Sequence, residues 1–220
     1  MDLHERCNTG KFKLTIFNGT APMNRSIMLL LVSILLAIPA LAGDDAANQK
    51  QMTAEAREVA KELITALGGE LKQALADSGP AGAITVCRDT APMLAGSLSR
   101  QTGWKVSRVS LKTRNPLIGQ PDLWEQQVLR DFDEAAAGGA TPVELQFSEI
   151  VTEPDGRYFR YMKALPVKPL CLTCHGTENL IPDSVRARLA QEYPNDQATG
   201  YYAGQIRGAV TIKRKLDSGK

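Results

Sequence analysis

The sequence contains little histidine and little cysteine, which restricts the metal sites that it can form. Of its 220 residues, two are histidine and four are cysteine. A structural zinc site normally uses two spaced pairs of such ligands, and the chain has one Cys-x-x-Cys pair without a second pair. The sequence also has no internal repeat and no low-complexity tract, so nothing indicates a repeat array.

The apolar run near the start of the sequence is too short to be typical of a transmembrane helix. It covers residues 27–40, follows Arg25 and ends in an Ala-x-Ala site, whereas spanning a bilayer takes about 20 apolar residues. We expect a leader over residues 1–42 that contains a signal peptide (23–42) cleaved after Ala42. Residues 1–22 are then an upstream start-site artefact or an extended n-region. This predicts a periplasmic mature chain that does not insert into a membrane; an uncleaved anchor is the alternative.

The chain also has no large net charge of either sign. The 26 basic and 24 acidic residues give a formal net charge of +2 at pH 7. Loss of residues 1–42 removes four basic and two acidic residues, which leaves 22 of each. A neutral chain gives no general electrostatic case for binding nucleic acid or an anionic membrane. We therefore expect neither as a partner. The 178 residues that remain suit one domain.

The most informative segment that is present is Cys171-Leu172-Thr173-Cys174-His175. A Cys-x-x-Cys-His run is typical of covalent attachment of c-type haem. The two thiols add across the vinyl groups of the porphyrin, and the adjacent imidazole takes one axial position on the iron. The run therefore predicts one haem c, bound through Cys171 and Cys174, with His175 as the proximal ligand. Export agrees with this prediction, because c-type haem is attached outside the bacterial cytoplasm.

The same residues allow three other interpretations. A zinc half-site would need the second ligand pair that the chain lacks. A thioredoxin-like redox pair normally follows a strand in a βαβ unit, whereas Pro166, Pro169 and Gly176 place this pair in a loop or a single helical turn. An ordinary disulfide is the third.

The ligand on the other side of the iron is not fixed by the residues alone. Without the leader His175 is the sole histidine, which excludes bis-histidine ligation and leaves a sulfur, an amine, water or no ligand. The sulfurs are those of Cys87, Met52, Met93 and Met162. Cys87 is either a buried apolar filler or an axial thiolate. Met52 is expected in a frayed first helical turn and Met162 in the core of a strand, and Met93 is about 120° from Cys87 around a helix.

The spacing of apolar residues predicts helices in the first part of the mature chain. Apolar residues at three-four spacing from Ala56 to Leu75 indicate a long amphipathic helix, which the pair Gly68-Gly69 weakens. Gly79-Pro80 then ends it, and Pro80 starts a second helix with Cys87 near the centre of its apolar stripe. Pro92 must kink or restart that second helix, because it lacks a backbone donor.

The remainder of the chain reads as mainly strands. Strands are expected at 104–110, 145–152, 158–165 and 206–213, and helices at 121–137 and near 182–192. The fold class is therefore α+β: long helices, then an antiparallel sheet with the haem loop inserted before its last strand. We assign residues 43–53 to a polar N-terminal segment, 54–216 to the monohaem domain and 217–220 to a tail.

Several segments resemble a family of exported, PAS-like c-haem domains with His/Cys axial ligation, long described as a domain of unknown function and best known from a cyanobacterial member. The carriers of the resemblance are 83–87 with Ala91-Pro92, 103–108, 110–112, 114–116, 121–125, 171–176, 193–201 and 204–209. The resemblance implies a PAS-like sheet wrapped by N-terminal helices, a single haem c, and Cys87 and His175 as the axial metal ligands. Arg108 and Arg114 are candidates to pair with the haem propionates.

Three classes of function remain. The first is a haem-based redox or small-gas sensor, which would need a signalling partner protein because the chain has no output domain. The second is a periplasmic electron-transfer cytochrome with a redox partner protein. The third is a small-molecule redox enzyme, which ranks last because no second histidine can act as a distal acid-base group. No catalytic residue is assigned, and we expect a protein that is not an enzyme.

Overall fold

The computed structural model describes residues 40–216, and those from Asp44 onward form one compact unit. The predicted signal peptide up to residue 39 and the tail 217–220 lie outside the described residues. None of the helices within 40–216 combines the length and the apolar character needed to cross a bilayer.

The long first helix, α2 (Ala40–Thr85), is amphipathic as predicted. Met52, Ala56, Ala60 and Leu63 recur at a spacing of three to four residues and are at most 2% exposed. The helix continues through Gly68-Gly69 and is interrupted at Gly79, whose φ of 65° is non-helical. The expectation that Met52 lies in a frayed first turn is wrong: the helix begins twelve residues earlier, and Met52 packs in the core.

Pro92 reshapes the helix that follows, as its missing backbone donor requires. A π-helical turn, η1 (Val86–Thr90), precedes α3 (Ala91–Thr102), and Pro92 stands in the first turn of α3. The N–H of Ala91 donates to the carbonyl of Val86, five residues back. Pro92 cannot donate to the carbonyl of Arg88, four residues back, so a widened turn relieves both the clash and the missing bond. Cys87 lies within this π turn.

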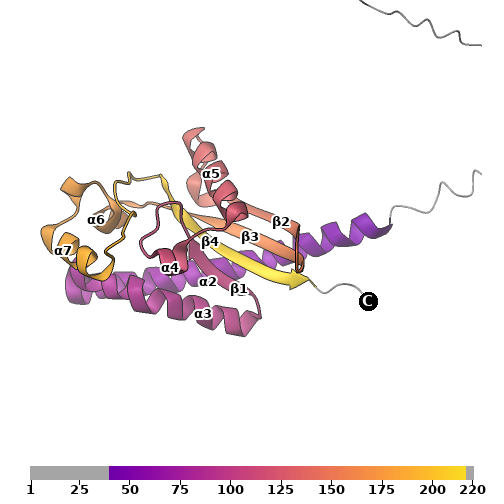
Figure 1. Cartoon of the computed structure of the whole chain (residues 1–220), viewed down its shortest axis with the longest axis horizontal. Coiled ribbons are helices and arrows are strands. Elements are labelled where there is room, and N and C mark those ends of the chain that lie inside the picture. Colours follow the sequence, from indigo (N-terminus) through magenta and orange to yellow (C-terminus); the bar gives the residue numbers. More distant parts are fainter. Residues whose placement is uncertain (1–39, 217–220) are drawn as a thin grey trace, which may run out of the picture. The chain divides into compact units, whose positions relative to one another are not determined.

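Four strands form one antiparallel sheet in the order β1-β4-β3-β2. The strands are β1 (Lys105–Val109), β2 (Gln146–Glu153), β3 (Gly156–Pro166) and β4 (Ile206–Leu216). All four were predicted within a few residues of these bounds. Helices α2 and α3 lie on one side of the sheet and α5 (Leu123–Ala137) on the other (Figure 1).

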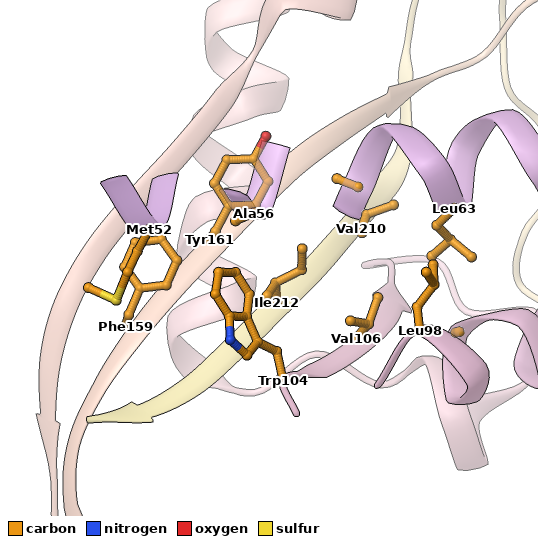
Figure 2. Packing of buried hydrophobic residues seen from close by; sticks show 12 residues of the cluster. Met52, Ala56, Leu63, Leu98, Trp104, Val106, Phe159, Tyr161, Val210 and Ile212 are labelled. Carbon is orange, nitrogen blue, oxygen red and sulfur yellow. The ribbon is translucent and has the colours of Figure 1, made fainter. Parts of the chain in front are cut away.

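The core lies on both faces of the sheet because neighbouring strand residues point to opposite sides. On one face Phe159, Tyr161 and Ile212 pack with Trp104 and with Met52 of α2, as Figure 2 shows. On the other face a second cluster joins sheet residues to the apolar stripe of α5: Val109, Val128, Leu129, Phe132, Met162, Ala164, Ile206 and Ala209. Met162 is thus a core residue, as predicted.

The long connection between β3 and β4 carries the remaining short elements. These are η3 (Pro169–Cys171), α6 (Leu172–His175), η4 (Glu178–Leu180) and α7 (Asp183–Glu192); earlier in the chain lie α4 (Pro116–Gly119) and η2 (Pro142–Glu144). The Cys-x-x-Cys-His segment therefore precedes the last strand. The α+β class is confirmed, and the PAS-like character stays a prediction.

Candidate functional site

The Cys-x-x-Cys-His segment forms a single helical turn. Cys171 ends the 3-10 turn η3, and Cys174 and His175 lie in α6. The turn stops at Gly176, where a Cβ would lie 2.5 Å from the carbonyl oxygen of Leu172. One turn thus carries both thiols and the imidazole, and Cys174 packs against the core cluster of Ile84, Ile181 and Val185.

The described cysteines are joined in neither a disulfide nor a cluster of metal-ligating side chains. Cys87, Cys171 and Cys174 are all free thiols. Within residues 40–216, no group of three or more His, Cys, Asp or Glu side chains is placed to hold a metal ion. The second observation argues against the zinc interpretation, because a structural zinc site normally takes four such ligands. A disulfide would need only Cys171 and Cys174, and both are thiols in this structure.

His175 is held in one orientation by its backbone partner. Its Nδ1 lies 2.6 Å from the carbonyl oxygen of Ala198, which can only accept, so Nδ1 carries the proton and Nε2 keeps its lone pair. The Nε of Arg207 is 3.1 Å from the same Nδ1; with Nδ1 protonated this contact joins two donors and is no hydrogen bond. The pKa of His175 is held well below its usual 6.5, mainly because the side chain is buried and also because the positive charges of Arg207 and Arg114 lie nearby. A neutral imidazole with a fixed Nδ1–H is the form that ligates a metal.

Arg114 fastens this turn to the loop that holds His175. It is buried, its Nε is 3.0 Å from the carboxylate of Asp196, and its Nη2 donates to the carbonyls of Cys174 and Ala198. A buried guanidinium with these three partners is a positioning group. Arg114 was one of two candidates to pair with a haem propionate; the hydrogen bonds that its side chain makes here are to the chain itself.

Cys87 and His175 line the same cavity, whose volume is about 340 Å³. Cys87 comes from the π turn and His175 from α6, so elements 88 residues apart in sequence meet here. None of the methionines considered as ligands contributes to the described lining. Met52 and Met162 are in the core clusters, and Met93 is 61% exposed. Among the described sulfurs, Cys87 alone lines the cavity with His175; Cys171 and Cys174 belong to the turn that carries His175 and are not part of the lining.

The rest of the cavity wall is apolar on one side and basic on the other. The apolar part comes from α3, β1 and β3: Ala91, Ala95, Val106, Val109 and Leu165. Arg108 and Arg207 also line the cavity. In the described part of the chain the Arg108 side chain makes no hydrogen bond or ion pair, whereas that of Arg207 donates to Ser110 Oγ at 2.7 Å. The wall thus offers an unpaired cation to an anionic group.

Sequence reasoning missed two lining residues, Tyr193 and Arg207. Tyr193 is 6% exposed, and burial raises the pKa of its hydroxyl to about 12. Both residues lie in segments that carry the family resemblance, but no local pattern in those segments indicates a side chain that faces a cavity. Their positions follow from contacts between distant parts of the chain.

The fold and this site define an α+β domain with a Cys-x-x-Cys-His turn beside a cavity that a further cysteine and a histidine share. The chain belongs to the Tll0287-like family, whose model matches residues 41–214. The resemblance found in the sequence is therefore confirmed.

One solved structure similar to this chain is the crystal structure of the cyanobacterial heme-protein Tll0287. The two chains are 23% identical, with a TM-score of 0.58, over 77% of this chain and 98% of the other. At this identity the likeness shows a shared fold. A comparison with curated proteins gives no match.

Proposed function

We propose that this protein is an exported monohaem c-type cytochrome-like domain that acts as a redox or small-gas sensor. The observation that carries the proposal is the placement of Cys87 and His175 on one cavity, with the Cys-x-x-Cys pair in the turn that supplies His175. The similarity to a cyanobacterial heme-protein supports the same cofactor.

The residues fit a haem. Covalent attachment would use Cys171 and Cys174: each sulfur forms a bond to one vinyl carbon, and the thiol proton ends on the neighbouring carbon. His175 has its Nε2 lone pair available, since Nδ1–H donates to Ala198. A haem has two propionates, and the unpaired guanidinium of Arg108 is suited to one of them. When bound, the haem would supply an iron that changes oxidation state and binds small ligands.

The π turn favours a sensor over a simple electron carrier. Cys87 lies in a widened turn between two helical segments that are each anchored in a core cluster. Single π turns within helices recur at functional sites. Release of the Cys87 sulfur on reduction would thus change this turn and leave the anchored segments in place. Signalling would require a partner protein; a periplasmic electron carrier that keeps both axial ligands is the alternative.

The proposal is tested on the mature protein from a strain that attaches c-type haem. The intact mass should exceed that of the polypeptide by one haem, and absorption and EPR spectra should change between wild type and Cys87→Ala. Met93→Ala is the matched control, since it removes an exposed sulfur near the cavity and should leave the spectra unchanged. A colourless protein without added mass would refute haem binding. Identical spectra for wild type and Cys87→Ala would remove Cys87 from the iron.

The choice between sensor and carrier needs a separate measurement. The reduced protein should bind carbon monoxide if Cys87 leaves the iron, and should not bind it if both ligands persist. Reduction without ligand exchange, together with rapid electron transfer to a periplasmic donor, would favour the carrier.

A further inference from the structure

A second cavity lies beside the first. Its volume is about 700 Å³, and it is formed by the second half of α5, the start of β4 and the loop that precedes β4. Ser110, Arg207 and Gly208 line both cavities. The second cavity therefore borders the wall on which His175 is held.

Small side chains keep this cavity open, and large apolar ones form its floor. Ala136 and Ala137 of α5 and the nearby Ala140 contribute only methyl groups to the lining. Leu129 and Ile206 lie beneath them and are 2% and 6% exposed. The cavity thus offers an apolar surface to the body of a small molecule.

Two cations line the cavity without a carboxylate partner in the described part of the chain. Lys112 donates to the carbonyl of Thr199 and lies 4.4 Å from the centre of the Tyr201 ring. The Nη1 of Arg207 donates to Ser110 Oγ. An ammonium has three donors and a guanidinium five, so both side chains retain donors for a further partner.

Asp133 is the acidic residue of this lining, and it too forms no ion pair with a described residue. The lining therefore has two cations against one carboxylate. An apolar floor beneath uncompensated positive charge is complementary to a molecule with an apolar body and an anionic head.

We propose that this cavity binds a small organic carboxylate, with its anionic group on Lys112 and Arg207 and its apolar body against Leu129 and Ile206. Carboxylates make their strongest hydrogen bonds with such cationic donors, and guanidinium groups can bind them in a bidentate manner.

The same contacts connect the ligand to His175. The Nε of Arg207 is 3.1 Å from His175 Nδ1, and the N–H of Tyr201 donates to the His175 carbonyl at 2.9 Å. The Tyr201 ring also meets the imidazole edge-on, at 6.3 Å between centres. A carboxylate would offset the positive charge of Arg207 and so favour the oxidised iron. This coupling rests on the proposed haem function, whereas the binding itself does not.

The test is isothermal titration calorimetry of the mature protein with benzoate, with benzamide as the neutral probe of similar shape. Benzoate should bind at one site, and benzamide at least about tenfold more weakly, because it lacks the charge. Lys112→Gln should weaken benzoate binding by about tenfold or more. Ala137→Trp should abolish it by filling the cavity, while Glu134→Trp, exposed on the same helix and outside the lining, should leave it unchanged.

Absence of benzoate binding up to 10 mM, a concentration that is about the weakest end of specific affinities, would overturn the proposal. So would binding that neither Lys112→Gln nor Ala137→Trp alters, since the anion would then occupy the first cavity or the iron. In the haem-loaded protein, benzoate should lower the reduction potential of wild type and not that of Ala137→Trp. A protein that binds benzoate but carries no haem would refute the proposed haem function and would still support the proposed carboxylate site.

Discussion

Arg160 should be one of the most costly residues to replace, because it joins α5 to the sheet through a buried network of charges. It is 4% exposed on β3, and its guanidinium lies 2.6 Å from Asp122, 3.2 Å from Glu125 and 3.5 Å from Glu153. The same group stacks over the ring of Trp124 at 4.3 Å. Replacement by methionine would keep the apolar stem and remove the charge.

We expect Arg160→Met to lower the free energy of unfolding by about 3 kcal/mol. Removal of one partner of a buried ion pair costs about 3–5 kcal/mol, because the other charge stays buried without compensation. Asp122 is 50% exposed and contributes little to this cost. Glu125 retains a hydrogen bond from Thr211, and Glu153 retains Lys213 at 2.6 Å, which places the cost at the low end of that range.

The assay is urea unfolding followed by far-UV circular dichroism, with wild type and variant in the same haem state. For a chain of this size, about 3 kcal/mol corresponds to a fall in Tm of roughly 6–12 °C. Arg130→Met is the control: Arg130 is exposed on α5, and its loss should cost less than about 0.5 kcal/mol. In the Arg160→Met background, Glu125→Gln should restore about 1 kcal/mol, because Gln keeps the hydrogen bond from Thr211 without a buried charge. A loss below about 1 kcal/mol for Arg160→Met would refute the reasoning.

Three further substitutions follow from the same contacts. Burial opposes ionisation of Asp122, but hydrogen bonds from Arg160 and from the Glu125 N–H outweigh it and lower its pKa below 3.8; its contribution is therefore present above pH 3.8 and lost as the pH falls through the lowered value. Asp122→Asn, which keeps a good helix cap, should cost at most about 1 kcal/mol at pH 7 and less at pH 3 in urea titrations, whereas a pH-independent loss would contradict this. Arg114→Lys should cost about 2–3 kcal/mol by thermal unfolding, because an ammonium cannot replace the forked donors; an unchanged Tm would show that the fork is dispensable. Gly208→Ala should reduce the soluble yield sharply, because the φ of Gly208 is 157° and a Cβ there would lie 2.3 Å from the backbone oxygen of Val109 in β1. Gly69→Ala is the control: it lies in α2 with no atom near its Cβ position and should raise the Tm slightly. Equal Tm values for the two variants would refute the clash.

Local patterns were sufficient for most of the fold. The spacing of Ala56, Ala60 and Leu63 predicted the buried face of α2, because residues three or four positions apart lie on the same face of a helix. Gly79-Pro80 predicted the break for the same reason, since φ and the missing donor are properties of those two residues. Met52 was misplaced because the prediction started the helix near Met52, whereas α2 already includes the residues from Ala40 onward.

The same distinction between local patterns and long-range contacts applies to the residues of the site. Cys171, Cys174 and His175 are close together in sequence, so their motif could be recognised, and Cys87 was the one cysteine outside that motif in the expected mature chain. The positioning role of Arg114 could not be inferred from the sequence, because the residues that it contacts are 60 to 84 positions away. Tyr193 and Arg207 were missed for the same reason: each faces the cavity only after α7 and β4 have packed.

The π turn explains why Cys87 faces a cavity when its neighbours on the helix face packed cores. Ile84 packs against α7, and Leu98 packs against the sheet. In a regular α-helix these two residues, 14 positions apart, would lie within about 40° of each other and face the same body. The extra residue of the π turn shifts the phase by about 100°, so each segment meets its own partner. Cys87 lies where the phase changes, where neither core closes over it. Pro92, which forces the widened turn, is thus a cause of the thiol's access to the cavity.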